Sequence, residues 1–199
     1  MRGTSNWTRY IQLRIFSGLE YNIPGLVRTE FNILFEPDFV DAPLRPYFLA
    51  YDSAVGSGSS NVLEIPISAG VNRRVPRSLA RAYARLPSQY QARRVLRKLG
   101  LLRMVWLRPS YSTLADMEAF ARRLADEGQP VLNVIFHSSE AIPGGSPYNR
   151  TADDVRAFMD RLDRFLAFAT GTLKAVPATF TEFRPAFARG TIAAVAQPR

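Results

Sequence analysis

The chain has 199 residues, 47% of them hydrophobic, and a formal net charge of +9. This length predicts a single domain, and the hydrophobic content is sufficient for a packed core. Because the sequence contains no cysteine, disulfides, thiolate zinc sites and cysteine nucleophiles are excluded. No apolar stretch reaches the roughly 18 residues of a membrane helix, and no secretory signal follows Met1. We therefore expect a cytoplasmic protein with no membrane partner.

The positive charge comes almost entirely from arginine, since Lys98 and Lys174 are the only lysines. Arginines are frequent between residues 73 and 103, where they alternate with leucine, tyrosine and valine at helical spacing. Such a run either binds a polyanion or forms the solvated face of a helix. We favour the solvated face, and on this interpretation nucleic acid is not expected as a partner.

The first hundred residues have an irregular pattern. Residues 10–19 are predicted to form an amphipathic helix, with no strand before it. Residues 62–67 are predicted to form an edge strand with Glu64 pointing inward. Residues 77–99 have the pattern of a helix with one break.

From residue 101 onward the pattern is regular. Strands are predicted at 101–107, 131–136 and 174–180, and helices at 112–128 and 151–171. Polar residues at the start of each helix indicate where the helices begin. An apolar stripe along the second helix indicates that one of its faces is buried. The order strand, helix, strand, helix, strand is typical of a parallel sheet or a (β/α) barrel.

The candidate site follows the apolar run 131–136, which reads as a strand buried on both faces. The run ends at His137, the only histidine in the chain, and a loop rich in glycine and proline follows. Ligands and catalytic groups gather at the carboxyl ends of parallel strands. Each residue here also has a structural interpretation: a hydrogen-bonded strand end for His137, core packing for Trp106, a helix cap for Glu140.

Several short motifs occur in an order known from one enzyme family. They are Asp41-Ala-Pro-Leu-Arg-Pro-Tyr47, Leu63-Glu-Ile-Pro66, Trp106-Leu-Arg-Pro109, and Phe136-His-Ser-Ser-Glu140 with Pro143-Gly-Gly-Ser-Pro-Tyr148. With them the chain resembles the polysaccharide deacetylase (NodB-homology) family of carbohydrate esterases, from about residue 38 to 183, with 184–199 as a tail. The resemblance implies one partial domain over residues 1–199, the C-terminal part of a distorted (β/α) barrel, incomplete as it stands.

The resemblance also implies an activity, the hydrolysis of acetyl amide or ester groups on a carbohydrate. His137 takes the position of the family's general acid, which protonates the leaving amine, and an imidazole suits that task. Trp106, Arg108, Glu140 and Tyr148 are then expected to bind the substrate, with Glu140 as a possible support for the imidazole.

Only the C-terminal half of the family pattern is present. The family holds a divalent metal such as zinc with a Thr-Phe-Asp-Asp strand end and a His-x-x-x-His helix, and neither motif occurs here. We therefore expect no cofactor in this chain, zinc only in the complete family domain, and no deacetylase activity from the 199 residues alone. Arg2-Gly3 resembles a remnant of a preceding family motif, so the chain is expected to start within the domain.

Three functions stay open on this evidence. The first is a deacetylase-like domain whose expected partners are a carbohydrate and either an N-terminal half or a second copy of the chain. The second is a non-catalytic carbohydrate-binding or interaction module, suggested by the aromatic residues near the predicted strand ends. The third, less favoured, is an arginine-rich protein that binds nucleic acid.

Overall fold

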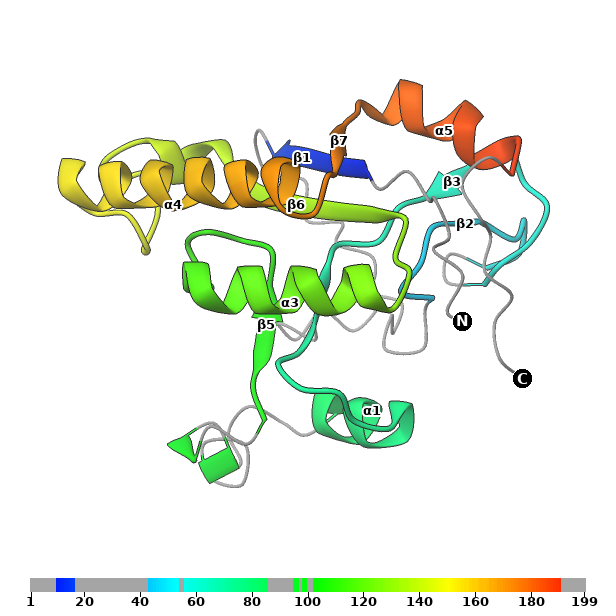
Figure 1. Ribbon diagram of the computed structural model, residues 1–199, viewed down its shortest axis with the longest axis horizontal. Coiled ribbons are helices and arrows are strands. Elements are labelled where there is room, and N and C mark those ends of the chain that lie inside the picture. The colour runs from blue at the N-terminus through cyan, green and yellow to red at the C-terminus, as the bar shows by residue number, and fades with distance from the viewer. Residues whose placement is uncertain are drawn as a thin grey trace.

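The protein has a mixed α/β fold of small sheets and helices (Figure 1). The computed structural model describes residues 10–16, 43–53, 56–85, 95–96, 98–99 and 102–190. Its strands are β1 (Tyr10–Phe16), β2 (Tyr47–Phe48), β3 (Leu63–Glu64), β4 (Ala69–Val71), β5 (Met104–Trp106), β6 (Val131–His137) and β7 (Val176–Pro177). Its helices are α1 (Arg77–Arg85), α3 (Leu114–Asp126), α4 (Ala152–Gly171) and α5 (Phe180–Ala188), with a short 3-10 turn at Ser138–Ala141.

A parallel sheet of three strands in the order β6-β1-β7 lies at the centre. β1 pairs with β6 along its whole length, from Tyr10 opposite Val131 to Phe16 opposite His137. β7 pairs with β1 only at Tyr10 and Ile11. The remaining described strands form two antiparallel pairs, β2 with β3 and β4 with β5. The described strands close no barrel.

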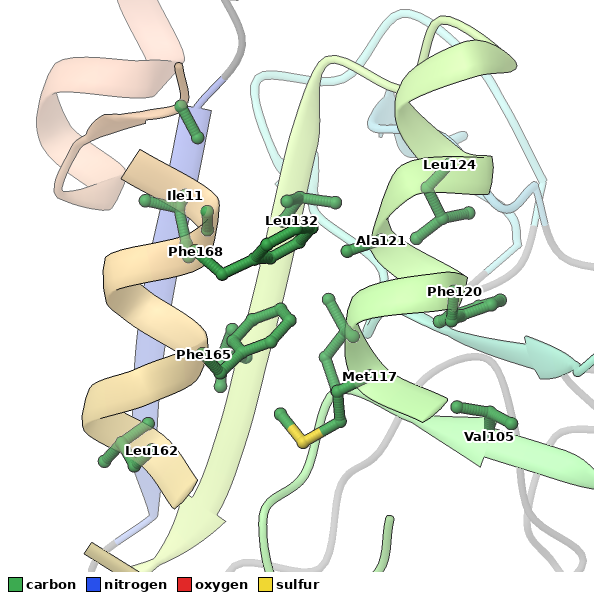
Figure 2. Packing of buried hydrophobic residues seen from close by; sticks show 14 of the residues in the cluster. Ile11, Val105, Met117, Phe120, Ala121, Leu124, Leu132, Leu162, Phe165 and Phe168 are labelled. Carbon is green, nitrogen blue, oxygen red and sulfur yellow. The ribbon is translucent and has the colours of Figure 1, made fainter. Parts of the chain in front are cut away.

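Strand β6 is buried on both faces, as its continuous apolar sequence predicts. Leu132, Val134 and Phe136 contribute to the main core, which α3 and α4 cover (Figure 2). Val131 and Ile135 point the other way, into two smaller clusters. The alternation follows from the two-residue period of a strand. The prediction of a doubly covered strand is confirmed.

Helices α3 and α4 contact each other beside this strand and supply most of the apolar side chains of the main core (Figure 2). Both begin where the sequence predicts a cap. The Thr113 hydroxyl accepts a hydrogen bond from the Asp116 N–H, and the Thr151 hydroxyl accepts one from the Asp154 N–H. Each cap satisfies a backbone donor that a helix start leaves unpaired. The predicted helices 112–128 and 151–171 are therefore confirmed to within two residues.

The buried side chain of Asn133 bonds the segment before β4 to the face of β6 that carries Val131 and Ile135. Its Nδ2 donates to the carbonyl oxygens of Ile65 (3.0 Å) and Pro66 (3.2 Å), and its backbone N–H donates to Ser68 Oγ (2.9 Å). The Ser68 carbonyl accepts from Leu107 N–H, and the Leu107 carbonyl accepts from Ile135 N–H at 3.0 Å. Through this chain of bonds the end of β5 lies beside β6.

Four of the predicted elements differ from the structure, one of them the strand predicted at 101–107, which is reduced to β5. Residues 10–16 form strand β1 and not a helix, because seven paired residues beside β6 outweigh the helical periodicity. The predicted strand 174–180 shrinks to β7, since a capping box of Thr179 and Glu182 starts α5. The predicted strand 62–67 is reduced to β3, because the carbonyl groups of residues 65 and 66 accept from a side chain. Residues 17–19, and most of 86–99, lie outside the described ranges.

In the part of the chain that the structure describes, no helix combines the length and the apolar character needed to cross a membrane.

Candidate functional site

The predicted site residues lie at the carboxyl ends of β5 and β6. His137 is the last residue of β6, and the turn Ser138–Ala141 follows it directly. Arg108 comes two residues after the end of β5, next to the Leu107 carbonyl that bonds β6. The backbone bond between the two strands therefore brings His137, Arg108 and Glu140 together, although they are up to 32 residues apart in sequence.

An ion pair between Arg108 and Glu140 forms the base of the site. Arg108 Nη2 lies 2.5 Å from Glu140 Oε1, and the two side chains are 11% and 1% exposed. The same Oε1 accepts the backbone N–H of His137 at 3.1 Å. Arg108 Nε and Glu140 Oε2 are buried and have no hydrogen-bond partner among the described residues. Glu140 thus holds Arg108 and the backbone of His137 in place. Its predicted role in substrate binding stays a prediction.

Tyr148, in the loop that follows the turn, contacts Arg108, one member of this ion pair. The Arg108 guanidinium carbon is 5.2 Å from the centre of the Tyr148 ring, within the range of a cation–π contact. Tyr148 as a whole residue is 48% exposed, so part of it meets solvent. Tyr148 and His137 are the site residues with surface available to a ligand, and Arg108 offers a smaller part.

The loop that carries Tyr148 is held in place by polar contacts. Asn149 Nδ2 donates to the Glu140 carbonyl at 2.6 Å, and the Gly144 N–H donates to the Asn149 carbonyl at 2.9 Å. Gly145 has no room for a side chain, because a Cβ there would lie 2.5 Å from the Ser139 carbonyl oxygen. Asn149 is not among the site residues that the sequence predicts. Its place just before the cap at Thr151 indicates an ordered loop end, but no sequence pattern names its partner.

The electrostatic environment of His137 favours the neutral imidazole. Burial lowers the pKa of His137 below the ordinary 6.5, the positive Arg108 lowers it further, and Glu140 partly raises it. The His137 ring therefore takes up a proton less readily than an ordinary histidine does.

Trp106, the last residue of β5, belongs to a small buried cluster. It is 7% exposed and packs against Ile67, Ala69 and Ile135 on the opposite face of β6 from the main core. Its ring contacts that of Tyr111, with centroids 5.6 Å apart, and Tyr111 is 53% exposed. Trp106 thus supports an exposed tyrosine on the loop after β5. The core interpretation of Trp106 agrees with this position.

The described residues do not fit the divalent metal that the resemblance implies. Within the described ranges, no three or more His, Asp or Glu side chains lie together so that they could hold an ion. Glu140, the acidic residue nearest His137 in sequence, is committed to Arg108. The expectation that zinc belongs to the complete family domain stays a prediction.

The arginine run at 73–103 is partly neutralised where the structure describes it. Arg74 Nε lies 3.5 Å from Glu127 Oε1, and Arg103 forms an ion pair with Asp116. Residues 93, 94 and 97 of the run lie outside the described ranges. The binding of nucleic acid by this run stays a prediction.

Comparison of the chain with models of protein families, with curated proteins and with solved structures found no significant match.

Proposed function

We propose that this protein binds carbohydrate at the carboxyl ends of β5 and β6 and that it is related to the polysaccharide deacetylases. The observation that carries the proposal is the meeting of His137, Arg108, Glu140 and Tyr148 at one strand end. His137, Glu140 and Tyr148 come from the motif at 136–148, the most specific part of the resemblance, and Arg108 comes from the motif at 106–109. On this proposal the chain is part of a distorted (β/α) barrel.

The exposed tyrosines provide surfaces of the kind that sugars bind. A pyranose ring has an apolar face of C–H groups and a rim of hydroxyls, so a tyrosine offers it both an apolar plane and a polar tip. The Tyr148 ring contacts the Arg108 guanidinium, and the Tyr111 ring contacts the ring of Trp106. Polar groups that fix the sugar's orientation would be His137 and the Arg108 guanidinium, in accord with sites that combine aromatic walls with few polar groups.

The histidine content of the chain supports binding in preference to hydrolysis. The sequence has one histidine, while the family's metal site draws on two others. We therefore propose that these 199 residues bind an acetylated sugar and release no acetate from it.

Calorimetric titration with an oligosaccharide of N-acetylated sugars tests the proposal. We expect saturable heat from the unaltered chain and at least a tenfold loss of affinity in Tyr148→Ala, about 1.4 kcal/mol, in line with a stacked aromatic contact. Tyr51→Ala is the matched control, since Tyr51 is 83% exposed and is not a residue of the site. Absence of saturable heat contradicts binding; acetate released from the sugar contradicts the non-hydrolytic part alone.

A partner strand fits the open side of the central sheet on this proposal. β7 covers β1 only at Tyr10 and Ile11, so the edge from Gln12 to Phe16 pairs with no other described strand. Unpaired strand edges favour addition of another strand. A preceding part of the barrel or a second copy of the chain would occupy this edge, and sedimentation at several protein concentrations distinguishes self-association from a monomer.

A further inference from the structure

The opposite end of β6 has a cluster of arginines that the proposed carbohydrate site does not use. Three guanidinium groups approach the carboxyl end of α3. Arg45 comes from the segment before β2, Arg74 from the segment before α1, and Arg123 from α3 itself. β6 separates this cluster from His137 by seven residues, about 20 Å at the usual rise of a strand.

All three arginines contact Glu127, two of them at its carboxylate and Arg45 at its backbone carbonyl. Arg45 Nη2 donates to the Glu127 carbonyl at 2.5 Å. Arg74 Nε lies 3.5 Å, and Arg123 Nε 3.7 Å, from the same oxygen, Glu127 Oε1. Three positive charges and one negative charge leave a formal excess of two positive charges. The carboxyl end of a helix favours nearby cations, which accounts for Arg45 but not for the gathering of all three.

The cluster has less negative charge than its burial requires. Burial lowers the pKa of Arg45 and that of Arg123, and Arg74 lowers the pKa of Arg123 further, while Glu127 opposes these shifts. Arg45 Nη1 and Arg123 Nε are buried and have no hydrogen-bond partner within the described residues. Unsatisfied buried donors are costly, and those of a cation more so. An anion that accepts from these guanidinium groups would offset this cost.

We propose that Arg45, Arg74 and Arg123 bind a phosphate-type dianion, either inorganic phosphate or the phosphate group of a small molecule. Guanidinium groups match the oxygens of a phosphate in pairs, and a dianion equals the formal charge excess. Arg74 is 64% exposed and Glu127 is 42% exposed, so a small anion can reach the cluster from solvent. This site is separate from the carbohydrate site and does not depend on it.

Titration with inorganic phosphate at fixed ionic strength, followed by calorimetry and by backbone amide NMR, tests the proposal. We expect saturable binding, with shifts at the amides of Glu127 and Gly128. Arg74→Gln should weaken binding roughly threefold or more, since one exposed ion contact is removed. Glu127→Gln should tighten it by a similar factor, because the competing carboxylate is lost. Arg156→Gln, an exposed arginine of α4 paired with Asp153, should leave the affinity unchanged.

The opposite responses of the two variants distinguish a binding site from a structural cluster. Unsaturable shifts, or equal affinities in Arg74→Gln and Glu127→Gln, would overturn the proposal. If Arg74→Gln does not fold, the exposed position of Glu127 still allows the second variant to decide. A sugar phosphate that binds more tightly than inorganic phosphate supports a small phosphorylated ligand. Equal binding of the two supports the free ion. Binding of a short oligonucleotide without binding of phosphate contradicts the proposal.

Discussion

The guanidinium of Arg108 and the carboxylate of Glu140 form a buried ion pair that joins the end of β5 to the turn after β6. The pair also receives the backbone N–H of His137, and the Glu140 carbonyl holds the loop of Tyr148 through Asn149. One carboxylic acid residue therefore positions three parts of the candidate site. Because buried charges are costly without partners, this arrangement should be sensitive to the removal of either charge.

Glu140→Gln should destabilise the protein by about 3 to 5 kcal/mol, the usual cost of leaving one member of a buried ion pair alone. Urea unfolding followed by circular dichroism measures the change. Asp153→Asn is the control, because Asp153 and Arg156 form an exposed pair on α4 and such pairs contribute about 0 to 1 kcal/mol. If both variants lose the same small free energy of unfolding, the Arg108–Glu140 pair contributes no more to stability than an exposed pair.

The imidazole of His137 should titrate below its ordinary pKa of 6.5. As the only histidine, it gives one Hε1 and one Hδ2 signal in proton NMR, so its titration is not confused with that of another histidine. Arg108→Gln should raise this pKa, because it removes a positive neighbour and leaves the Glu140 charge uncompensated. A pKa at or above 6.5 in the unaltered protein, or no rise in the variant, disagrees with the electrostatics of the site.

The same shift predicts how stability depends on pH. The folded protein holds the His137 proton less tightly than the unfolded chain does, so the stabilising contribution of His137 is complete above pH 6.5. It is lost as the pH falls through the lower pKa of the folded state. The free energy of unfolding should therefore decrease in this window, and His137→Asn should reduce the slope there. An unchanged slope in His137→Asn would assign the pH dependence to other groups.

Asn133→Leu should cost about 2 to 4 kcal/mol despite its apolar surroundings. The leucine leaves the buried carbonyl oxygens of Ile65 and Pro66 without their donor, and each such loss costs about 1 to 3 kcal/mol. Thermal unfolding measures the effect. Gln129→Ala, which removes one exposed bond to the Leu44 carbonyl, should change stability by less than about 0.5 kcal/mol.

Replacing Gly145 with alanine should impair the carbohydrate site, whereas replacing Gly171 with alanine should stabilise the protein. At Gly145 a Cβ would clash with the Ser139 carbonyl oxygen, so Gly145→Ala should shift the Tyr148 loop and weaken carbohydrate binding. At Gly171, the last residue of α4, nothing lies within 4 Å of the added Cβ, so Gly171→Ala should stabilise the protein by roughly 0.5 to 1 kcal/mol. Thermal unfolding and calorimetry with the same oligosaccharide compare the two.

The sequence patterns that agree with the structure are local ones. The caps at Thr113 and Thr151 define helix starts through residues three positions away, and β6 is recognisable from its own apolar run. The pairing of β1 with β6 joins residues about 120 positions apart. No local pattern in residues 10–19 identifies β6 as their partner, so the helical periodicity alone predicts the wrong secondary structure. The prediction of an amphipathic helix there is wrong.

The candidate site follows the same division. The strand-end rule placed His137 and Arg108 at neighbouring strand ends without any knowledge of their contact. Their common partner Glu140 is buried because of a 32-residue contact that no local pattern encodes. Trp106 and Tyr148 both read as aromatic residues near strand ends, yet the first is buried and the second exposed. Which side of the strand end meets solvent depends on the tertiary packing.

The most direct test of carbohydrate binding at this site is the NMR signal of the His137 ring during titration with an N-acetylated oligosaccharide. We predict a saturable shift of the His137 Hε1 signal, with the same dissociation constant as calorimetry gives, and its loss in Tyr148→Ala but not in Tyr51→Ala. A ring signal that stays unchanged while the sugar saturates the protein would place binding elsewhere and contradict the assignment of the site.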